Sequence, residues 1–215
     1  ACLPTINYCL NLVDIQSLTS NDILSIANCK NIQHLPIFKT TKTLDMSGCS
    51  NITSVDNARS LYSIKMVCCY GVNDVSFLGK LFHVNMNSCY NVTGYKKLTG
   101  VSELILDNCS SVTDVSMFTN ATLVSLRNCN NVTNLQGLEL VKTVYVSSHN
   151  LSSMQGLGKN VSVEMCGYFE DVSSLNNVPH VAINCSNKQI NLSALTNICS
   201  LTMRYCSGFI NLKQI

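Results

Sequence analysis

Cysteine is the residue whose number and spacing in this chain most suggest chemistry. The 215-residue sequence holds thirteen cysteines, enough for a disulfide framework, a zinc site or a set of reactive thiols. His149 and Ser186 interrupt an otherwise regular series of them. Nine recur at one position of a repeating pattern, and we call them the cysteine column: Cys9, Cys29, Cys49, Cys69, Cys89, Cys109, Cys129, Cys166 and Cys206.

The spacing of the cysteine column argues against bridging or metal binding. Neighbouring members are expected one strand spacing apart, about 4.8 Å, with parallel side chains. A disulfide needs facing Cβ atoms about 3.8 Å apart, and zinc needs four ligands that converge tetrahedrally. We therefore predict buried thiols that fill space and donate weak hydrogen bonds to adjacent loop backbone, with no metal and no cofactor. A metal or redox site in which His149 joins its cysteine neighbours is the alternative.

Other residues that could carry chemistry form weaker patterns. Cys68 precedes a column member and is expected on the other face, either as a reactive thiol or as an idle surface residue. We find no Ser/His/Asp set, paired carboxylates or phosphate loop, so no catalytic residue and no enzyme activity are predicted. Four Asp residues recur at one position and are expected to cap backbone N–H groups, with calcium binding as the alternative: Asp14, Asp74, Asp114 and Asp171.

Asparagine recurs two residues after the column cysteine. Because Asn tolerates left-handed backbone, this position predicts a turn with positive φ. The same motif spells N-x-S/T triplets, which are glycosylation acceptors in secreted proteins. Asn120 and Asn160 lie in linkers and are the better candidates, whereas Asn51 and Asn131 are expected to be buried.

The elements that carry these residues repeat every twenty residues. In the coil at 104–118, Leu104 and Leu106 alternate as in a short strand with one buried face. Val112, Val115 and Phe118 follow at a spacing of three, which suits 3-10 or extended turns and leaves no room for an α-helix before the next strand. The first strand position recurs, with a shortening before the ninth coil, at Pro4, Leu24, Leu44, Ile64, Val84, Leu104, Val124, Val144, Val161, Val181 and Leu201.

Self-similarity at this period is typical of a solenoid. We predict a single array over residues 1–215 of about eleven coils, shortened at coil eight, about 144–160. A parallel sheet is expected on one face and loops or 3-10 turns on the other. Neither end shows a polar cap, so we expect a fragment or an array without caps, whose ends could support self-association.

The repeat resembles the leucine-rich repeat, whose segment L-x-x-L-x-L-x-x-N/C-x-L is matched by residues 101–109 and Val112. Residues 112–116 (VTDVS) resemble a segment of bacterial internalins. The cysteine resembles that of F-box protein repeats, which carry a helix and a longer period, and similar arrays occur in predicted proteins of large DNA viruses, algae and protists. The resemblance implies a fold of the α/β-solenoid class, here mostly β, with a partner-binding face.

Composition narrows the class of partner. Charged residues make up 12% of the chain and the formal net charge is +2, which gives no strong field to attract nucleic acid or an anionic membrane. No apolar run approaches the roughly 20 residues of a membrane span. We expect no nucleic-acid partner and no membrane insertion.

We therefore predict a non-enzymatic scaffold for protein–protein interaction, intracellular (cytoplasmic) or a virion component, because so many unbridged thiols favour a reducing compartment. The alternative is a secreted or surface structural or adhesion protein that carries glycans. The exposed strand residues are mixed in character and include the Tyr and Arg that are enriched at binding hot spots. They are either a plain solvated sheet or the partner-binding residues, for which our candidates are Lys65, Asn85, Ile105, Arg127, Tyr145, Glu164, Arg204 and Tyr205.

Overall fold

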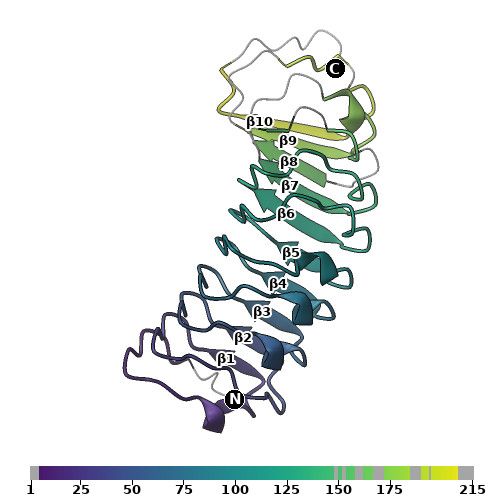
Figure 1. The fold of residues 1–215 in the computed structure, drawn as a ribbon. Helices are drawn as coiled ribbons and strands as arrows, with labels where there is room; N and C mark the ends of the chain where they lie inside the picture. The colour runs from purple at the N-terminus through teal and green to yellow at the C-terminus, as the bar shows by residue number, and fades with distance from the viewer. Residues whose placement is uncertain are drawn as a thin grey trace. The chain divides into compact units, whose positions relative to one another are not determined.

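A computed structural model describes residues 5–147, 150–151, 154–157, 162–166, 172–184, 190–193 and 195–207 (Figure 1). The chain divides into two compact units, Ala1–Ser111 and Val112–Ile215. Each unit is a parallel β-solenoid. The predicted self-association through the chain ends concerns residues 1–4 and 208–215, which lie outside the described residues.

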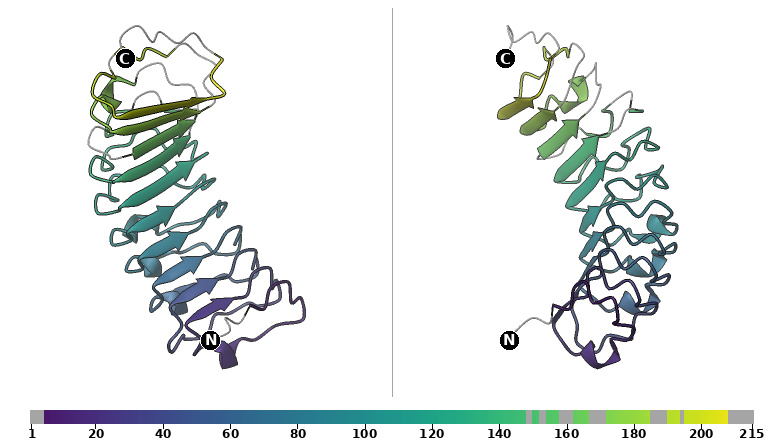
Figure 2. Two further views of the ribbon diagram at one scale, coloured as in Figure 1. Left: turned by 180° about the vertical axis from the view of Figure 1, so that it is seen from behind. Right: turned by 90° about the vertical axis from the view of Figure 1, so that its left-hand side faces the viewer.

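The first unit stacks five short strands in chain order. Every strand pairs in parallel with the next at an offset of twenty residues, and Thr5 adds a bridge to Ser25 before the first strand. Within this unit the strands form one side and 3-10 turns lie on the other (Figure 2). The strands are β1 (Ile23–Ser25), β2 (Thr43–Asp45), β3 (Ser63–Lys65), β4 (His83–Asn85) and β5 (Glu103–Ile105), and the 3-10 turns are η1 (Gln16–Leu18), η2 (Asp56–Ala58), η3 (Ser76–Leu78) and η4 (Tyr95–Lys97).

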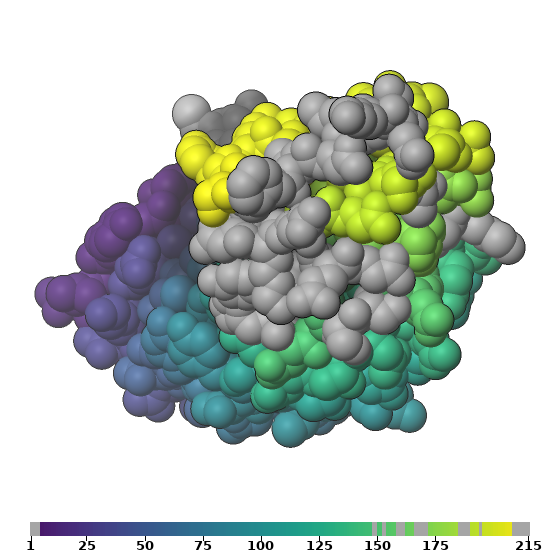
Figure 3. Space-filling view, turned by 90° about the horizontal axis from the view of Figure 1, so that it is seen from above, coloured from purple at the N-terminus to yellow at the C-terminus, as the bar shows by residue number. Residues whose placement is uncertain are grey.

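The second unit has longer strands, again parallel and in chain order. Its strands are β6 (Leu123–Arg127), β7 (Thr143–Ser147), β8 (Ser162–Cys166), β9 (His180–Asn184) and β10 (Ser200–Arg204), and its 3-10 turn is η5 (Ser173–Leu175). Among the described strands, β10 pairs with β9 alone. Its residues Leu201 and Met203 are half-buried. Seen from that end, yellow atoms of the coil that contains β10 form part of the surface (Figure 3).

The core of each unit is a set of apolar columns that successive coils share. In coil four the inward residues Ile64, Met66, Val72, Val75 and Leu78 are all at most 1% exposed. Since one coil is only a few strand residues and a turn, its apolar side chains are covered by the coils on either side. The alternation and the spacing of three therefore predicted the buried residues correctly.

The predicted secondary structure is confirmed. The described residues contain short strands and 3-10 turns and no α-helix. No helix in this described part is long and apolar enough to cross a membrane.

The predicted register of the ninth coil is wrong by two residues. Val144 pairs with Val163, which in turn pairs with Val181, so Val163 and not Val161 takes the first strand position. Val161, Val163 and Met165 alternate, and a shift of two residues leaves the same side chains on the same face. The hydrophobic pattern therefore could not distinguish the two registers.

The positive-φ position also differs from the prediction. Left-handed backbone occurs at the residue immediately before the cysteine, as at Asn28 (φ 62°), Gly48 (φ 74°) and Ser88 (φ 62°). The Asn two residues after the cysteine has another use in one case, because the Asn31 side chain donates to the Leu10 carbonyl of the preceding coil. Asn does occupy the left-handed position in some coils, as at Asn28. The Asn after the cysteine is instead explained, at Asn31, by the hydrogen bond of its side chain.

Candidate functional site

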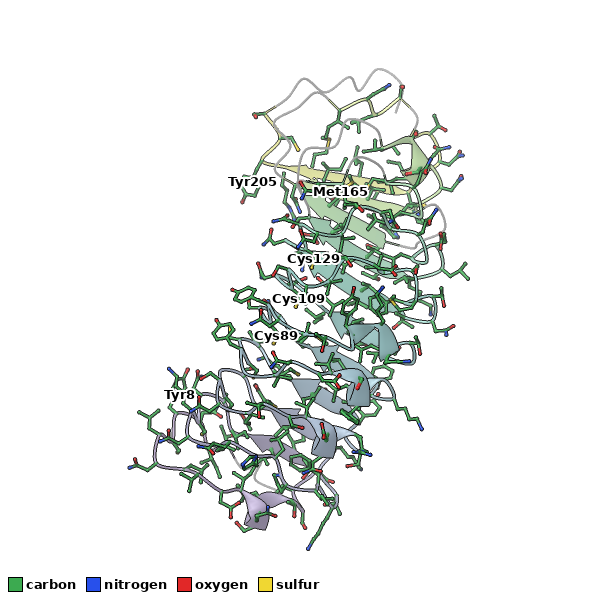
Figure 4. All side chains as sticks on the ribbon, in the orientation of Figure 1. Tyr8, Cys89, Cys109, Cys129, Met165 and Tyr205 are labelled. Carbon is green, nitrogen blue, oxygen red and sulfur yellow. The ribbon has the colours of Figure 1, made fainter. Side chains whose placement is uncertain are left out.

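The cysteine column joins each coil to the one before it. In the first unit, the thiols of Cys49, Cys69, Cys89 and Cys109 each donate to the backbone carbonyl 23 residues earlier, at 3.1 Å between Sγ and O. Cys89 and Cys109 lie above one another in successive coils (Figure 4). The predicted role as small buried donors to adjacent loop backbone is seen here, since each acceptor directly follows a strand, as Met46 follows β2.

Each acceptor carbonyl in this arrangement takes two hydrogen bonds. The Met46 carbonyl accepts the Cys49 N–H of its own coil at 3.0 Å and the Cys69 thiol of the next coil at 3.1 Å. The Met66 carbonyl does the same with the Cys69 N–H and the Cys89 thiol. A carbonyl has two lone pairs, so the thiol uses the acceptor capacity that the turn leaves over.

Burial makes these thiols poor nucleophiles. Desolvation raises the pKa of Cys49 and of Cys89 from 9.0 to about 11. It raises the pKa of Cys69 further. Because the thiolate is the reactive form, the buried members of the column are protonated and unreactive at neutral pH.

Two members of the predicted column need separate treatment. Cys166 ends β8 and is in register with Ser147 and Asn184, so it does not stand at the column position, as follows from the corrected register. Cys9 stands at the position but is exposed. His149 lies outside the described residues, and among those that are described no three His, Cys, Asp or Glu side chains gather as metal ligands.

The Asp residues cap turns as predicted. The carboxylates of Asp14, Asp74 and Asp114 each accept the backbone N–H two residues on, at 2.9 to 3.0 Å. Asp171 lies outside the described residues.

The glycosylation triplets are more accessible than expected. Asn51 and Asn131 are exposed, which corrects the prediction that they are buried in their turns. Their neighbours Ile52 and Val132 are the residues that point inward, at 0% exposure. Asn120 is exposed as predicted, and Asn160 lies outside the described residues.

Three predicted partner-binding residues lie in one row on the exposed strand face of the first unit. Lys65, Asn85 and Ile105 are in register with one another, after Asp45. The Lys65 amino group is 3.4 Å from the Asp45 carboxylate. A second pair on this face, which the sequence did not indicate, joins His83 and Glu103 at 3.1 Å.

The structure brings three other predicted residues together on the strand face of the second unit. Arg127 on β6 places its guanidinium carbon 4.2 Å from the ring centroid of Tyr145 on β7. Its Nη2 is 3.3 Å from Oε2 of Glu164 on β8. The other carboxylate oxygen, Oε1, accepts a hydrogen bond from the Asn184 amide on β9 at 3.0 Å. We call Arg127, Tyr145, Glu164 and Asn184 the strand-face cluster.

Strand register explains how the strand-face cluster forms. Tyr145 and Glu164 occupy one row, while Arg127 and Asn184 occupy the next row along the strands. Arg127 therefore extends diagonally across Tyr145 to reach Glu164, and Asn184 extends back from the other side. The Arg127 and Glu164 side chains together span the two strand spacings between β6 and β8, roughly 10 Å in all.

The contacts of the cluster order its side chains more than they stabilise the fold. The side chains of Arg127 and Glu164 are 40% and 30% exposed, and ion pairs this accessible contribute about 0.2 to 1 kcal/mol. A cation–π contact at an exposed site adds about 0.5 to 1 kcal/mol. Together these contacts favour the arrangement in which Arg127 lies over Tyr145 and beside Glu164.

Not every predicted residue joins the cluster. Arg204 ends β10 in register with Asn184. Tyr205 follows it in the left-handed position before Cys206, and it is 84% exposed. Asn184 was missed because the sequence marks it only as part of a glycosylation triplet, and no sequence signal gives its register with Glu164.

Comparison with known proteins gives the fold its class. No protein-family model and no curated protein matches the chain. Among solved structures, an internalin (InlF) from Listeria monocytogenes is similar at a TM-score of 0.64 and 14% identity, over 94% of this chain and 60% of that one. Internalin C2 of the same organism is similar at 0.50 and 16%, over 88% and 84%.

The functional domain of InlJ from Listeria monocytogenes, described as including a cysteine ladder, is similar at a TM-score of 0.45 and 13% identity, over 93% of this chain and 52% of that one. The chain spans three fifths of the length of the InlF structure. The twenty-residue coils, the parallel strands and the internalin structures agree: this chain has the leucine-rich-repeat fold that the internalins have.

Proposed function

We propose that this chain is a non-enzymatic scaffold that binds a partner protein through the strand-face cluster of its second unit. The observation that supports this most is the pre-ordered contact of Arg127 with both Tyr145 and Glu164. Residues of this kind that already hold one conformation lose little side-chain entropy when a partner arrives.

The composition of the cluster favours a protein as its partner. Tyr and Arg are over-represented among residues that carry binding energy between proteins. Arg127 and Glu164 carry opposite charges and lie 3.3 Å apart, so the cluster has no excess charge to attract a polyanion. A partner that offers a carboxylate to Arg127 or a donor to Glu164 would match it.

The proposal is tested by quantitative capture from the native source, with immobilised wild-type chain and three variants. Arg127→Gln and Tyr145→Ser each remove a group that we assign to binding. Lys142→Gln is the matched control, since Lys142 is exposed and stands before β7 and not on the strand face.

A specific partner would be captured by the wild type and by Lys142→Gln and lost with both cluster variants. With that partner purified, titration calorimetry should show that Arg127→Gln weakens binding by about tenfold or more, as for a hot-spot residue. A partner that binds all four proteins equally would refute the assignment of the site.

We also propose that the chain works in a reducing compartment, inside a cell or as a component of a virion. The buried column thiols act as hydrogen-bond donors, and Cys9, Cys68 and Cys199 are further thiols that are exposed or half-buried. The alternative, a secreted or surface protein, draws support from the exposed Asn51, Asn120 and Asn131 triplets.

A further inference from the structure

A hollow of about 510 Å³ opens among the 3-10 turns of the first unit, and no sequence motif pointed to it. Its lining comes from three successive coils. Arg59 follows η2, Phe77 and Gly79 belong to η3 and its end, Lys80 comes next, and Lys97 closes η4. Its volume falls in the range of roughly 300 to 1,000 Å³ that is typical of ligand pockets.

Arg59 is held in place at the edge of this hollow. Its Nε donates to the Asp56 carbonyl at 2.9 Å, and its Cζ is 5.3 Å from the ring centroid of Phe77. One side of the guanidinium is thus fixed by the backbone and its face is covered by the ring. The terminal nitrogens are left to bind an anion in a planar, two-point geometry.

Gly79 lines the hollow at a point where no side chain fits. A Cβ built on Gly79 would stand 2.2 Å from the Lys97 carbonyl oxygen, which is backbone and cannot move aside. The coil of η3 therefore approaches the coil of η4 closely at this point. Gly79 therefore contributes only backbone to the lining of the hollow.

The hollow is positively charged. Arg59, Lys80 and Lys97 line it, and no carboxylate does. Within the described residues, Lys80 and Lys97 are exposed and form no ion pair. The carboxylate of Asp56 accepts the Ser54 hydroxyl and lines a separate hollow.

The same charge pattern extends over four successive coils. The segments 37–42, 57–62, 77–82 and 97–102 contain no Asp or Glu. Three coil steps cover roughly 14 Å, about the length of four extended residues. The five cations of these segments are Lys39, Lys42, Arg59, Lys80 and Lys97.

We propose that this surface binds an extended acidic segment of a protein, with its carboxylates on Arg59, Lys80 and Lys97 and an apolar part against Phe77. The whole first unit holds eight Lys and Arg against seven Asp and Glu, so it has no long-range field to attract nucleic acid. The site is separate from the strand-face cluster, which lies in the other unit, and the two proposals can fail independently.

The test is fluorescence polarisation with labelled hexaglutamate and, as a neutral counterpart, labelled hexaglutamine. We expect saturable binding of hexaglutamate only, weaker at higher salt. The double variant Lys80→Gln/Lys97→Gln should weaken it by about threefold or more, since each exposed pair contributes only modestly. Arg59→Lys should also weaken it, because Lys keeps the charge but loses the planar two-point contact.

Lys30→Gln/Lys142→Gln is the matched control, since it removes the same charge at exposed sites outside the hollow. It should leave the affinity within about twofold, since all three cations that line the hollow stay in place. The proposal is overturned if hexaglutamate does not bind or if the control weakens binding as much as the hollow variant. It is also overturned if a single-stranded DNA hexamer binds more tightly than hexaglutamate and is weakened by the hollow variant.

Discussion

At the scale of single residues, the surroundings of the cysteine column explain why this position repeats cysteine and not a larger or more polar residue. The site is buried at Cys69, it is small, and a backbone carbonyl of the preceding coil can accept a second hydrogen bond there. A thiol meets all three conditions at little desolvation cost. The recurrence of cysteine in this chain is therefore a packing solution and not evidence of catalysis.

The first prediction concerns Cys69, whose thiol donates to the Met46 carbonyl. Cys69→Ala should lower the free energy of unfolding by about 1 to 3 kcal/mol, because it leaves a small cavity and removes a donor from a buried acceptor. Urea unfolding measures the change. Cys9→Ala is the control, because Cys9 is exposed, and it should change the stability by less than about 0.5 kcal/mol. Equal effects of the two variants would contradict the role given to burial.

The second prediction concerns alkaline pH. Burial raises the pKa of Cys49 and Cys89 from 9.0 to about 11, so above pH 9 the unfolded chain loses protons that the folded chain keeps. Their stabilising contribution is complete below pH 9 and is lost as the pH rises toward 11, at about 1.4 kcal/mol per pH unit for each thiol. The urea midpoint should fall across this range, and it should fall less in Cys49→Ala/Cys89→Ala. A double variant with the wild-type pH dependence would speak against this account.

The third prediction concerns the left-handed position before the cysteine. Gly48→Ala should destabilise by about 1 to 3 kcal/mol, because φ is 74° there and a Cβ would stand 2.3 Å from the Asn28 Oδ1. Ser88→Gly, at the equivalent position with φ 62°, should be close to neutral or slightly stabilising, since glycine adopts this backbone without strain. Thermal unfolding of both variants checks the pair, and a Gly48→Ala protein as stable as the wild type would refute the backbone argument.

At the scale of elements, strand register decides which side chains meet. Arg127, Tyr145 and Glu164 were each predicted as exposed strand residues, and the structure adds that they touch. Alternation in the sequence indicates which face a side chain takes, but not how far along the neighbouring strand it lies. The contacts within the cluster, and the part of Asn184 in it, could therefore not be predicted.

The fourth prediction tests the network within the strand-face cluster. Glu164→Gln should weaken partner binding by severalfold, because it removes the charge that holds Arg127 while it keeps a shape close to that of the native side chain. It should leave the unfolding midpoint nearly unchanged, since an exposed ion pair contributes little. Calorimetry with the captured partner and urea unfolding separate the two effects. Unchanged affinity would remove Glu164 from the site.

Regular coils were predictable and irregular ones were not. In the first unit the period of twenty places every strand correctly, because a strict repeat leaves one register. Between Val144 and Val181 the spacing changes to 19 and then 18 residues, and the alternating Val161, Val163 and Met165 fit two registers equally well. The hollow at Arg59 was also missed, because its lining comes from three successive coils and no motif indicates where their side chains leave open space.

At the scale of the whole molecule, thiol accessibility separates the two proposed locations of the protein. Intact mass after alkylation of denatured, unreduced protein from its native source should show thirteen free thiols and no added sugar. Under native conditions Cys9 and Cys199 should react first, since they are exposed, and the buried Cys69 should react slowly. Missing thiols or hexose-sized mass steps would instead support the secreted or surface alternative.

The strand face of the second unit is the part of the molecule on which the proposed function depends. A photo-reactive phenylalanine analogue at position 145 places a crosslinker inside the strand-face cluster, while the same analogue at position 117 places it in a turn of the same unit. With the captured partner, we predict efficient crosslinking from position 145 and little from position 117. Crosslinking from position 117 alone, or equally from both positions, would contradict a scaffold that binds through its strands.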